Sequence, residues 1–273
     1  DNIYLYDENG KRYIDGPGGM WCNNIGHGNK EIAEAVKNQI ETMDYCSPFS
    51  ESSEKAAELA SVLSELSPGD LNTVFFTPDG SSANETALRF MMLYNNILGR
   101  PEKKHIISRD QAYHGSTYLT ASITGKDREK NNFDFESTFI HHVGSPNPYR
   151  RKDNQTVDDF CDEKVKEFED KILEIGPNKV AAYIAEPVLA SGGCIVPPKN
   201  YIKRFWEICK KHDILYISDE IVTGFGRLGH FFCSQEEFGI IPDIITSAKG
   251  ITSGYIPLGA VLISDRLMKS ISK

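Results

Sequence analysis

The feature that most constrains the fold is a series of short apolar runs separated by longer polar or helical stretches. Each run has the length of a strand and is too short for a core helix, whereas the residues between runs, such as 83–91, carry apolar positions at helical spacing. Strands that alternate with helices indicate parallel strands joined by crossover helices. The sequence therefore predicts an α/β fold with a largely parallel central sheet and helices on both faces. The runs are 73–77, 105–108, 181–185, 214–218 and 243–246.

The first fifty residues follow another pattern. Residues 2–15 are typical of two short strands joined by the turn Asn9-Gly10, the strongest short hairpin signal. Apolar residues at every fourth position over 32–40 predict a helix, and the spacing over 56–66 predicts a second one. We therefore expect an N-terminal segment, residues 1–50, and a larger α/β domain, residues 51–273.

The charge balance argues against one class of partner. Thirty Lys and Arg against 39 Asp and Glu give a net charge of −9, so no nucleic-acid partner is expected. No stretch approaches the ~18 apolar residues of a membrane-spanning helix, and the polar start is not typical of a secretory signal. The sequence predicts a soluble, cytoplasmic protein with no membrane partner.

The six cysteines are spread along the chain without any C-x-x-C pair. This spacing predicts reduced, individually buried thiols rather than disulfides. Cys209 with His212, and the neighbours His141 and His142, lack a second pair of ligands at a suitable distance in sequence. No metal site is expected.

A turn of small residues, Pro78-Asp79-Gly80-Ser81-Ser82, follows the first apolar run. The free N–H groups and the dipole at the start of a helix can bind a phosphate, and Gly80 lets the anion approach closely. A second interpretation fits equally: Ser81 or Ser82 caps the helix and Glu85 completes a capping box. The turn alone leaves both open.

An acidic pair, Asp219-Glu220, ends the apolar run 214–218. An unpaired carboxylate at the buried mouth of a sheet costs several kcal/mol, so Asp219 needs a cation or a strong donor. Arg227 is one candidate partner, and the protonated nitrogen of a heterocycle is another.

Lys249 follows the apolar run 243–246 and is flanked by small residues, with no acidic residue between Asp243 and Asp265. A crowded amine without a counterion loses its proton more readily and can then form a Schiff base. The alternative for a single lysine is an ordinary surface side chain.

These three features stand in an order along the chain that resembles a known enzyme family. A phosphate turn at 80–82, an acid at 219 and a lysine at 249 resemble the large-domain signature of fold-type I enzymes, which use pyridoxal 5′-phosphate (PLP). More narrowly, the chain resembles the class III, or omega-, aminotransferases, in an amine:pyruvate-like branch. Further motifs stand in the family's order: Asp15-Gly16, Asn24-Ile25-Gly26-His27-Gly28, Tyr113-His114-Gly115, Ala185-Glu186-Pro187-Val188 and Ser253-Gly254-Tyr255-Ile256-Pro257-Leu258-Gly259.

The resemblance implies two catalytic residues. Lys249 would hold PLP as an internal aldimine and, once released by substrate, carry the proton between the substrate carbon and the cofactor. Asp219 would keep the pyridine nitrogen protonated, which makes PLP an electron sink. The resemblance also implies that residues 1–50 belong to a small domain and the active-site entrance, and that 51–273 form the large PLP-binding domain.

The remaining roles concern binding of the cofactor and substrate. By resemblance, Gly80 and Ser81 would take the phosphate, and Glu186 would line the site. Tyr113 would stack on one face of the ring, and Ile221 or Val222 would pack on the other. His114 belongs to the same neighbourhood, either as a cofactor contact or as a structural donor, and the same two readings apply to Arg227. Trp21 would wall the substrate pocket or, alternatively, anchor the core.

Two departures from the family pattern matter. Asp79 stands where the family often has a phosphate-binding serine, so we leave it out of the binding set. The family also continues beyond the strand after the lysine into a smaller C-terminal domain. No segment of this sequence matches that domain, which is therefore expected to be missing here.

The resemblance implies an aminotransferase that moves an amino group from an amine or omega-amino acid donor to a keto acid such as pyruvate. Val222 favours the amine:pyruvate branch, because ornithine and 4-aminobutyrate branches commonly carry a glutamine there. A homodimer is also implied. Two alternatives stay open: another PLP reaction on the same fold, such as an aminomutase or a decarboxylating transaminase, and a non-catalytic PLP-fold binding protein.

Overall fold

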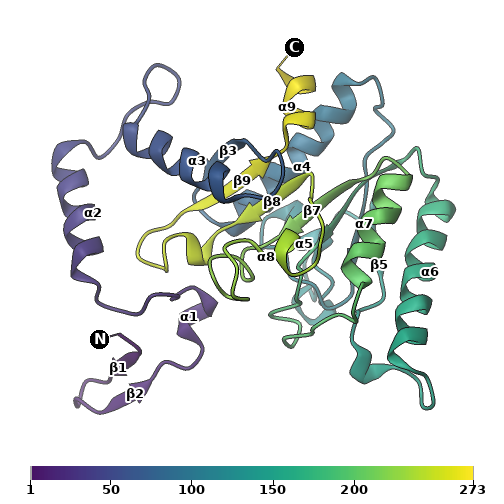
Figure 1. Ribbon diagram of the computed structural model, residues 1–273, viewed down its shortest axis with the longest axis horizontal. Coiled ribbons are helices and arrows are strands. Elements are labelled where there is room, and N and C mark those ends of the chain that lie inside the picture. The colour runs from purple at the N-terminus through teal and green to yellow at the C-terminus, as the bar shows by residue number, and fades with distance from the viewer. Residues whose placement is uncertain (1, 273) are drawn as a thin grey trace.

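A seven-stranded mixed sheet organises the computed structural model, which describes residues 2–272 (Figure 1). Its strand order is β3-β9-β8-β7-β6-β4-β5. Strand β9 runs antiparallel to both of its neighbours, β3 and β8, and the pairs from β8 to β5 are parallel. The prediction of a largely parallel sheet is confirmed. The strands are β3 (Thr73–Thr77), β4 (His105–Arg109), β5 (Ile140–Val143), β6 (Val180–Ala185), β7 (Leu215–Asp219), β8 (Ile244–Ser247) and β9 (Gly259–Ile263).

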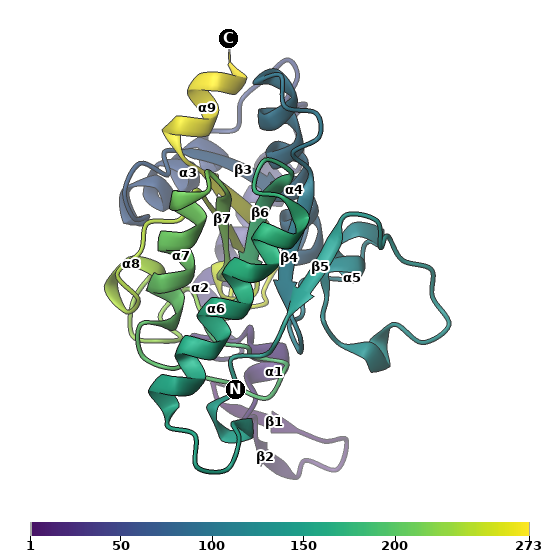
Figure 2. The same ribbon diagram turned by 90° about the vertical axis from the view of Figure 1, so that its right-hand side faces the viewer.

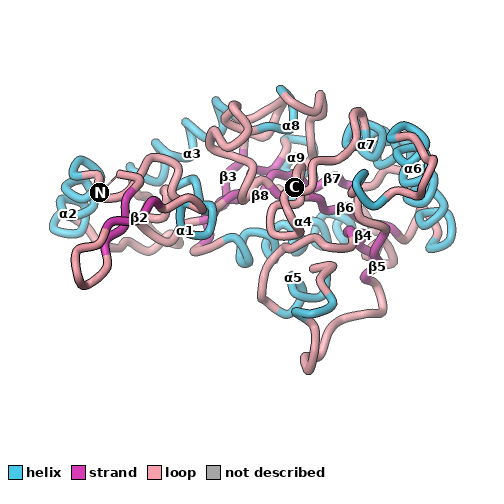
Figure 3. The backbone as a smooth tube through the Cα atoms, turned by 90° about the horizontal axis from the view of Figure 1, so that it is seen from below, coloured by secondary structure: helices cyan, strands magenta, loops and turns pink. Residues whose placement is uncertain are grey.

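Helices cover both faces of this sheet (Figures 2 and 3). One face packs against α4 (Gly80–Ile97), α5 (Tyr118–Ile123) and α9 (Asp265–Ile271). The other packs against α6 (Val157–Ile175) and α7 (Tyr201–Lys211), with α3 (Glu54–Leu66) further along and α8 (Cys233–Glu236) beside it. Short 3-10 turns are η1 (Asp127–Glu129), η2 (Pro148–Arg150) and η3 (Lys249–Ile251).

The N-terminal residues lie at one side of the sheet (Figure 1). The predicted hairpin is confirmed as β1 (Tyr4–Tyr6) paired antiparallel with β2 (Arg12–Ile14), and it is followed by α1 (Gly18–Trp21) and α2 (Lys30–Thr42). The predicted helix is present, but its apolar stripe is not buried, since Ile40 is 62% exposed. The division at residue 50 stays a prediction.

Two features of the chain differ from the sequence analysis or extend it. The cysteines are free thiols, but they are not all buried, because Cys194 is exposed and Cys22 and Cys46 are half-buried. Among residues 2–272, no group of three or more His, Cys, Asp or Glu side chains is placed to hold a metal ion. The same residues include no helix long and apolar enough to cross a membrane.

We expect acidification to weaken the fold through His142 on β5. Its Nε2 lies 3.1 Å from the Ile123 carbonyl oxygen, and burial, reinforced by the charge of Lys130, lowers the pKa of His142 from 6.5 to about 4. Between these pH values His142 is protonated in the unfolded chain but stays neutral in the folded protein. The free energy of unfolding should therefore fall by about 2–3 kcal/mol as the pH drops from 6.5 to 4.

The measurement is urea unfolding across pH 4–7, compared with the variant His142→Gln. Glutamine keeps an N–H donor but does not titrate, so the slope of stability against pH should become shallower over this window. An unchanged slope would show that His142 is not the group responsible, since His105 and His141 also have lowered pKa values because of burial.

Candidate active site

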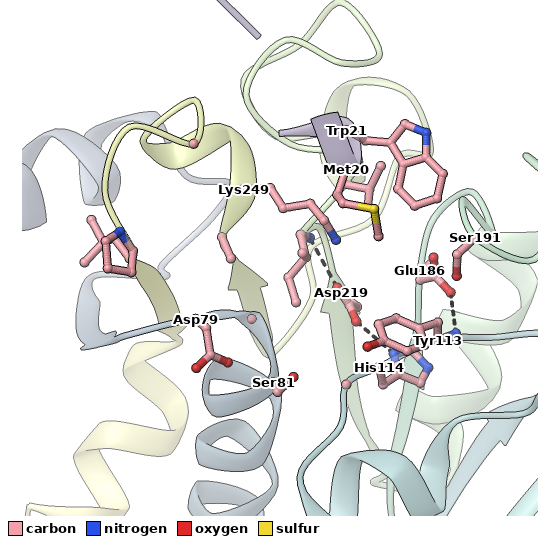
Figure 4. Close-up of a pocket in the computed structure, with 18 of the residues that line it drawn as sticks. Met20, Trp21, Asp79, Ser81, Tyr113, His114, Glu186, Ser191, Asp219 and Lys249 are labelled. Atoms are coloured by element: carbon pink, nitrogen blue, oxygen red, sulfur yellow. Dashed lines mark hydrogen bonds and ion pairs between the residues drawn. The ribbon is translucent and has the colours of Figure 1, made fainter. Parts of the chain in front are cut away.

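A cavity of about 870 Å³ lies at the carboxyl ends of the parallel strands, where ligands bind in open α/β sheets. Its walls come from the turns after β3, β4, β6, β7 and β8, together with α1 (Figure 4). The structure brings ten of the residues singled out from the sequence to this one cavity, whereas Arg227 does not line it. The ten are Trp21, Gly80, Ser81, Tyr113, His114, Glu186, Asp219, Ile221, Val222 and Lys249.

The turn after β3 opens helix α4, but its cap differs from the one weighed above. Asp79 is the N-cap residue: its Oδ1 accepts from the Ser82 backbone N–H at 2.8 Å, and its Oδ2 accepts from the Ser82 hydroxyl at 3.0 Å. Glu85 instead accepts a 2.6 Å bond from the Thr117 hydroxyl. The capping box of a serine with Glu85 is therefore wrong.

This cap leaves the first turn of α4 facing the cavity. Gly80 and Ser81 line the cavity at the helix N-terminus, where backbone N–H groups lack acceptors within the helix. A Cβ on Gly80 would lie 2.8 Å from the Ile221 Cδ1 atom, so glycine lets Ile221 pack against the turn. The Ser81 hydroxyl accepts from the Ser116 N–H at 3.1 Å.

Asp219 ends β7 and is 3% exposed. Its Oδ2 accepts from Asn84 Nδ2 at 2.8 Å and lies 2.8 Å from His114 Nδ1, while its Oδ1 accepts from the Ile221 N–H at 3.2 Å. These donors fix the carboxylate and still leave acceptor capacity, because a carboxylate offers about four lone-pair sites.

Arg227 is not the partner of Asp219. It donates instead to the Trp21 carbonyl at 3.2 Å and to Asn24 Oδ1 at 2.6 Å. That alternative is wrong, because the donors that the Asp219 carboxylate needs are supplied by Asn84, His114 and the Ile221 N–H.

Asn84 was missed by the sequence analysis although it joins three parts of the site. Besides Asp219, its Nδ2 donates to the His114 carbonyl at 2.7 Å, and its Oδ1 accepts from the Thr246 hydroxyl at 2.7 Å. Its position could have identified it from the sequence, because Asn84 is a polar residue one helical turn after Gly80 and therefore lies on the same face of α4 as Gly80.

Glu186 follows β6 and supports the segment that carries Tyr113. Its two carboxylate oxygens accept from the backbone N–H groups of Tyr113, at 2.9 Å, and Ala190, at 3.1 Å. Burial raises the pKa of Glu186, and the negative charge of Asp219 adds to that effect, while His114 opposes it. Lys126 Nζ lies over the Tyr113 ring, 5.2 Å from the ring centroid.

Lys249 begins η3 one residue beyond the strand β8, with a backbone φ of +46°. This left-handed conformation costs a non-glycine residue about 1–3 kcal/mol and is typical of functional sites. Figure 4 shows its side chain extending into the cavity near Asp219 and Met20. A Cβ on the neighbouring Gly250 would lie 2.6 Å from Asn24 Nδ2, so the small residue beside the lysine is required by packing.

The residues around Trp21 are bound to the loop that carries Lys249. The Ile25 N–H donates to the Ser253 hydroxyl at 3.1 Å, and the Tyr255 hydroxyl donates to the Gly26 carbonyl at 2.8 Å. Trp21 is half-buried and lines the cavity, so it is not an anchor of the core. Lys126 and Arg128 also line the cavity and were not singled out from the sequence.

Comparison with known proteins finds aminotransferases both among family profiles and among individual relatives. The profile of the family described as Aminotransferase class-III matches residues 1–273. Vanillin aminotransferase of Capsicum annuum is 40% identical over 99% of this chain and 60% of its own length. Putrescine–pyruvate aminotransferase of Pseudomonas aeruginosa is 38% identical over 100% of this chain and 60% of its own length.

Solved structures agree. The omega transaminase from Pseudomonas jessenii in complex with PMP matches with a TM-score of 0.97 and 40% identity, over 100% of this chain and 60% of that one. The chain thus spans about three fifths of the length of these relatives.

Proposed function

The chain belongs to the class III aminotransferase family, whose members use PLP. From this premise we propose that the protein is an aminotransferase. It would pass an amino group from an amine or omega-amino acid donor to a keto acid such as pyruvate. The observation that carries the proposal is the meeting of Lys249, Asp219 and the first turn of α4 in one cavity.

The donor set fits the cofactor. PLP has a phosphate, a ring nitrogen and an aldehyde, and the cavity presents a helix N-terminus, a fixed carboxylate and a primary amine. Gly80 and Ser81 would bind the phosphate. Tyr113 would lie on one face of the ring, with Ile221 or Val222 on the other. When bound, PLP supplies an electron sink for the electrons left on the substrate carbon.

The chain's own residues would then do three things. Lys249 Nζ would hold the cofactor covalently and afterwards move the proton to and from the substrate carbon. Asp219 would hold the proton on the ring nitrogen, because an ion pair in this nearly dry site favours the charged partner. Asn84 and His114 keep that carboxylate oriented, and Glu186 orients Tyr113 through its backbone.

The substrate side of the proposal rests on Trp21 and Val222. Trp21 and Met20 wall the cavity from the N-terminal side, and Val222 adds an apolar surface. A relative named for putrescine and pyruvate is consistent with an amine donor and pyruvate acceptor. We further propose that the active protein is a homodimer, which the exposed apolar side chains of Ile40, Tyr45 and Phe49 support, and that residues 1–50 form the entrance to its site.

The test is formation of alanine from pyruvate with a panel of amines, diamines and omega-amino acids. The proposal predicts turnover that requires both an amine and a keto acid, with alternating loss and recovery of the bound cofactor's spectrum. Binding of PLP without amine transfer to any keto acid would refute it.

We expect Gly115→Ala to weaken PLP binding although Gly115 is not itself among the proposed cofactor contacts. Gly115 has a φ of +139°, and a Cβ there would lie 2.8 Å from the Ser81 hydroxyl and 2.9 Å from Ser81 Cα. The clash should displace the phosphate turn and weaken PLP affinity about tenfold or more, a loss of about 1.4 kcal/mol or more.

The matched control is Gly99→Ala. Gly99 also has a positive φ, +70°, but a Cβ there meets nothing within 4 Å. Both variants should lose stability through backbone strain of about 1–3 kcal/mol, and only Gly115→Ala should lose affinity in a fluorescence titration with PLP. Equal affinities in the two variants would contradict the role of Ser81.

A further inference from the structure

Two basic side chains line the cavity and have no role in the function proposed above. Lys126 and Arg128, called the basic pair below, lie at the start of η1, just after α5. Lys126 is half-buried with its Nζ over the Tyr113 ring, whereas Arg128 is exposed. The basic pair therefore extends from the wall beside Tyr113 toward the solvent side of the cavity.

The backbone before Lys126 is held against the segment that carries Tyr113. The Gly125 N–H donates to the Ala112 carbonyl at 2.9 Å, and the Gly125 carbonyl accepts from the Gln111 N–H at 2.7 Å. A Cβ on Gly125 would collide with the backbone at the end of β4, so glycine is required there. These contacts fix the point from which the Lys126 side chain enters the cavity.

The carboxylates nearby are engaged elsewhere. Asp127, between the two basic residues, does not line the cavity. Its charge acts on Lys130 instead, where burial lowers the pKa and Asp127 opposes that effect. Three carboxylates do line the cavity, and each accepts the hydrogen bonds described above: Asp79, Glu186 and Asp219. We therefore expect the basic pair to attract an anionic group of a molecule in the cavity.

The cavity has room for a substrate beside the cofactor. Its volume of about 870 Å³ is near the upper end of the ~300–1,000 Å³ range of small-molecule sites. The amine of a donor has to approach Lys249, and Figure 4 shows Lys249 and Tyr113 entering the cavity from different sides. A group bound by the basic pair therefore belongs to the end of the substrate remote from the reacting amine.

We propose that Lys126 and Arg128 bind a carboxylate at the far end of the donor, so that the protein prefers omega-amino acids to plain amines and diamines. The inference rests on the proposed aminotransferase function and names the donor class of that same site. Lysine and arginine donate charge-assisted hydrogen bonds to a carboxylate, and they repel the second ammonium group of a diamine.

The kinetic test uses three donors of equal length that differ in one end group. These are 5-aminopentanoate, pentylamine and cadaverine, each assayed with pyruvate on the PLP-bound protein. The value of kcat/KM should be about tenfold higher for 5-aminopentanoate than for pentylamine, and lowest for cadaverine. The double variant Lys126→Met/Arg128→Met should bring the ratio of the first two close to one, whereas Lys126→Arg should keep it.

The matched control is Lys130→Met. Lys130 Nζ also lies over an aromatic ring, 5.4 Å from the Phe135 centroid, but Lys130 does not line the cavity. This variant should keep the wild-type preference among the three donors.

A binding measurement does not depend on turnover. Glutarate carries a carboxylate but no amine, and calorimetric titration of the PLP-bound protein should give an affinity about tenfold weaker in the double variant than in the wild type. The affinity for PLP itself should be the same in both.

The outcomes separate this inference from the proposed function. Equal kcat/KM for the three donors in the wild type, or an unchanged preference in the double variant, would overturn the carboxylate site and leave the aminotransferase standing. Loss of PLP affinity with an unchanged preference would assign the basic pair to the cofactor and also overturn it. If no donor reacts, the proposed function fails, and equal glutarate affinities would still refute the site.

Discussion

Lys249→Ala should abolish covalent cofactor binding and reduce amine transfer by a factor of about 10⁴ or more. Proton transfer by a positioned side chain contributes about 10²–10⁴-fold by itself, and this variant also removes the amine that would hold the cofactor. The absorbance band expected at ~400–430 nm for a lysine–PLP imine should vanish. Purified protein mixed with PLP, scanned and then assayed with amine and pyruvate, gives both results.

The control for this variant is a second lysine of the same cavity. Lys126→Ala also removes an amine from the cavity wall, where its Nζ lies over the Tyr113 ring, but it should keep the absorbance band. If Lys126→Ala loses the band and Lys249→Ala keeps it, the assignment of Lys249 is wrong.

Asp219→Asn should reduce kcat by about 10²–10³-fold while leaving cofactor binding largely intact. Asparagine has the same shape, but it cannot hold a proton on the ring nitrogen by charge, and loss of one such electrostatic contact costs about this much. The phosphate turn and Lys249 are unchanged, so the cofactor should still bind. Single-turnover kinetics with a saturating amine separate the slow proton removal from binding.

The neighbouring acid offers the matched control. Glu220 is also buried, but its carboxylate accepts from the N–H groups of Cys233, at 2.8 Å, and Ser234, at 3.1 Å, at the start of α8. Burial raises the pKa of Glu220. Glu220→Gln should lower stability and change kcat little, whereas a kcat for Asp219→Asn within a few-fold of wild type would contradict the proposed role of Asp219.

The fold was largely predictable because its signals are local. Apolar runs of strand length, helical spacing between them and the Asn9-Gly10 turn each report on a few adjacent residues. Strand β9 was not among the runs listed from the sequence, and nothing in residues 259–263 distinguishes an antiparallel strand from a parallel one. Nor could the exposure of Ile40 be read from periodicity, which shows an apolar face but not what covers it.

Most members of the site were predictable from the sequence, but the hydrogen bonds that connect them were not. The residues named from sequence line one cavity because loops at the carboxyl ends of parallel strands converge. The prediction for Arg227 was wrong because it chose a partner for Asp219 that is close in sequence. The actual partners of Asp219 are Asn84 and His114, and both are more than 100 residues away in sequence. The prediction of Ser81 or Ser82 as the cap was wrong because aspartate and serine are equally good cap residues, and Asp79 takes that position.

One measurement tests the central claim, that Lys249 holds the cofactor. The purified protein with PLP is reduced with borohydride, digested and mapped by mass spectrometry. We predict that the peptide containing Lys249 gains the mass of one reduced pyridoxyl phosphate, and that the gain is absent without reduction. A protein that gains no mass, or that carries the added group on another lysine, would contradict the account.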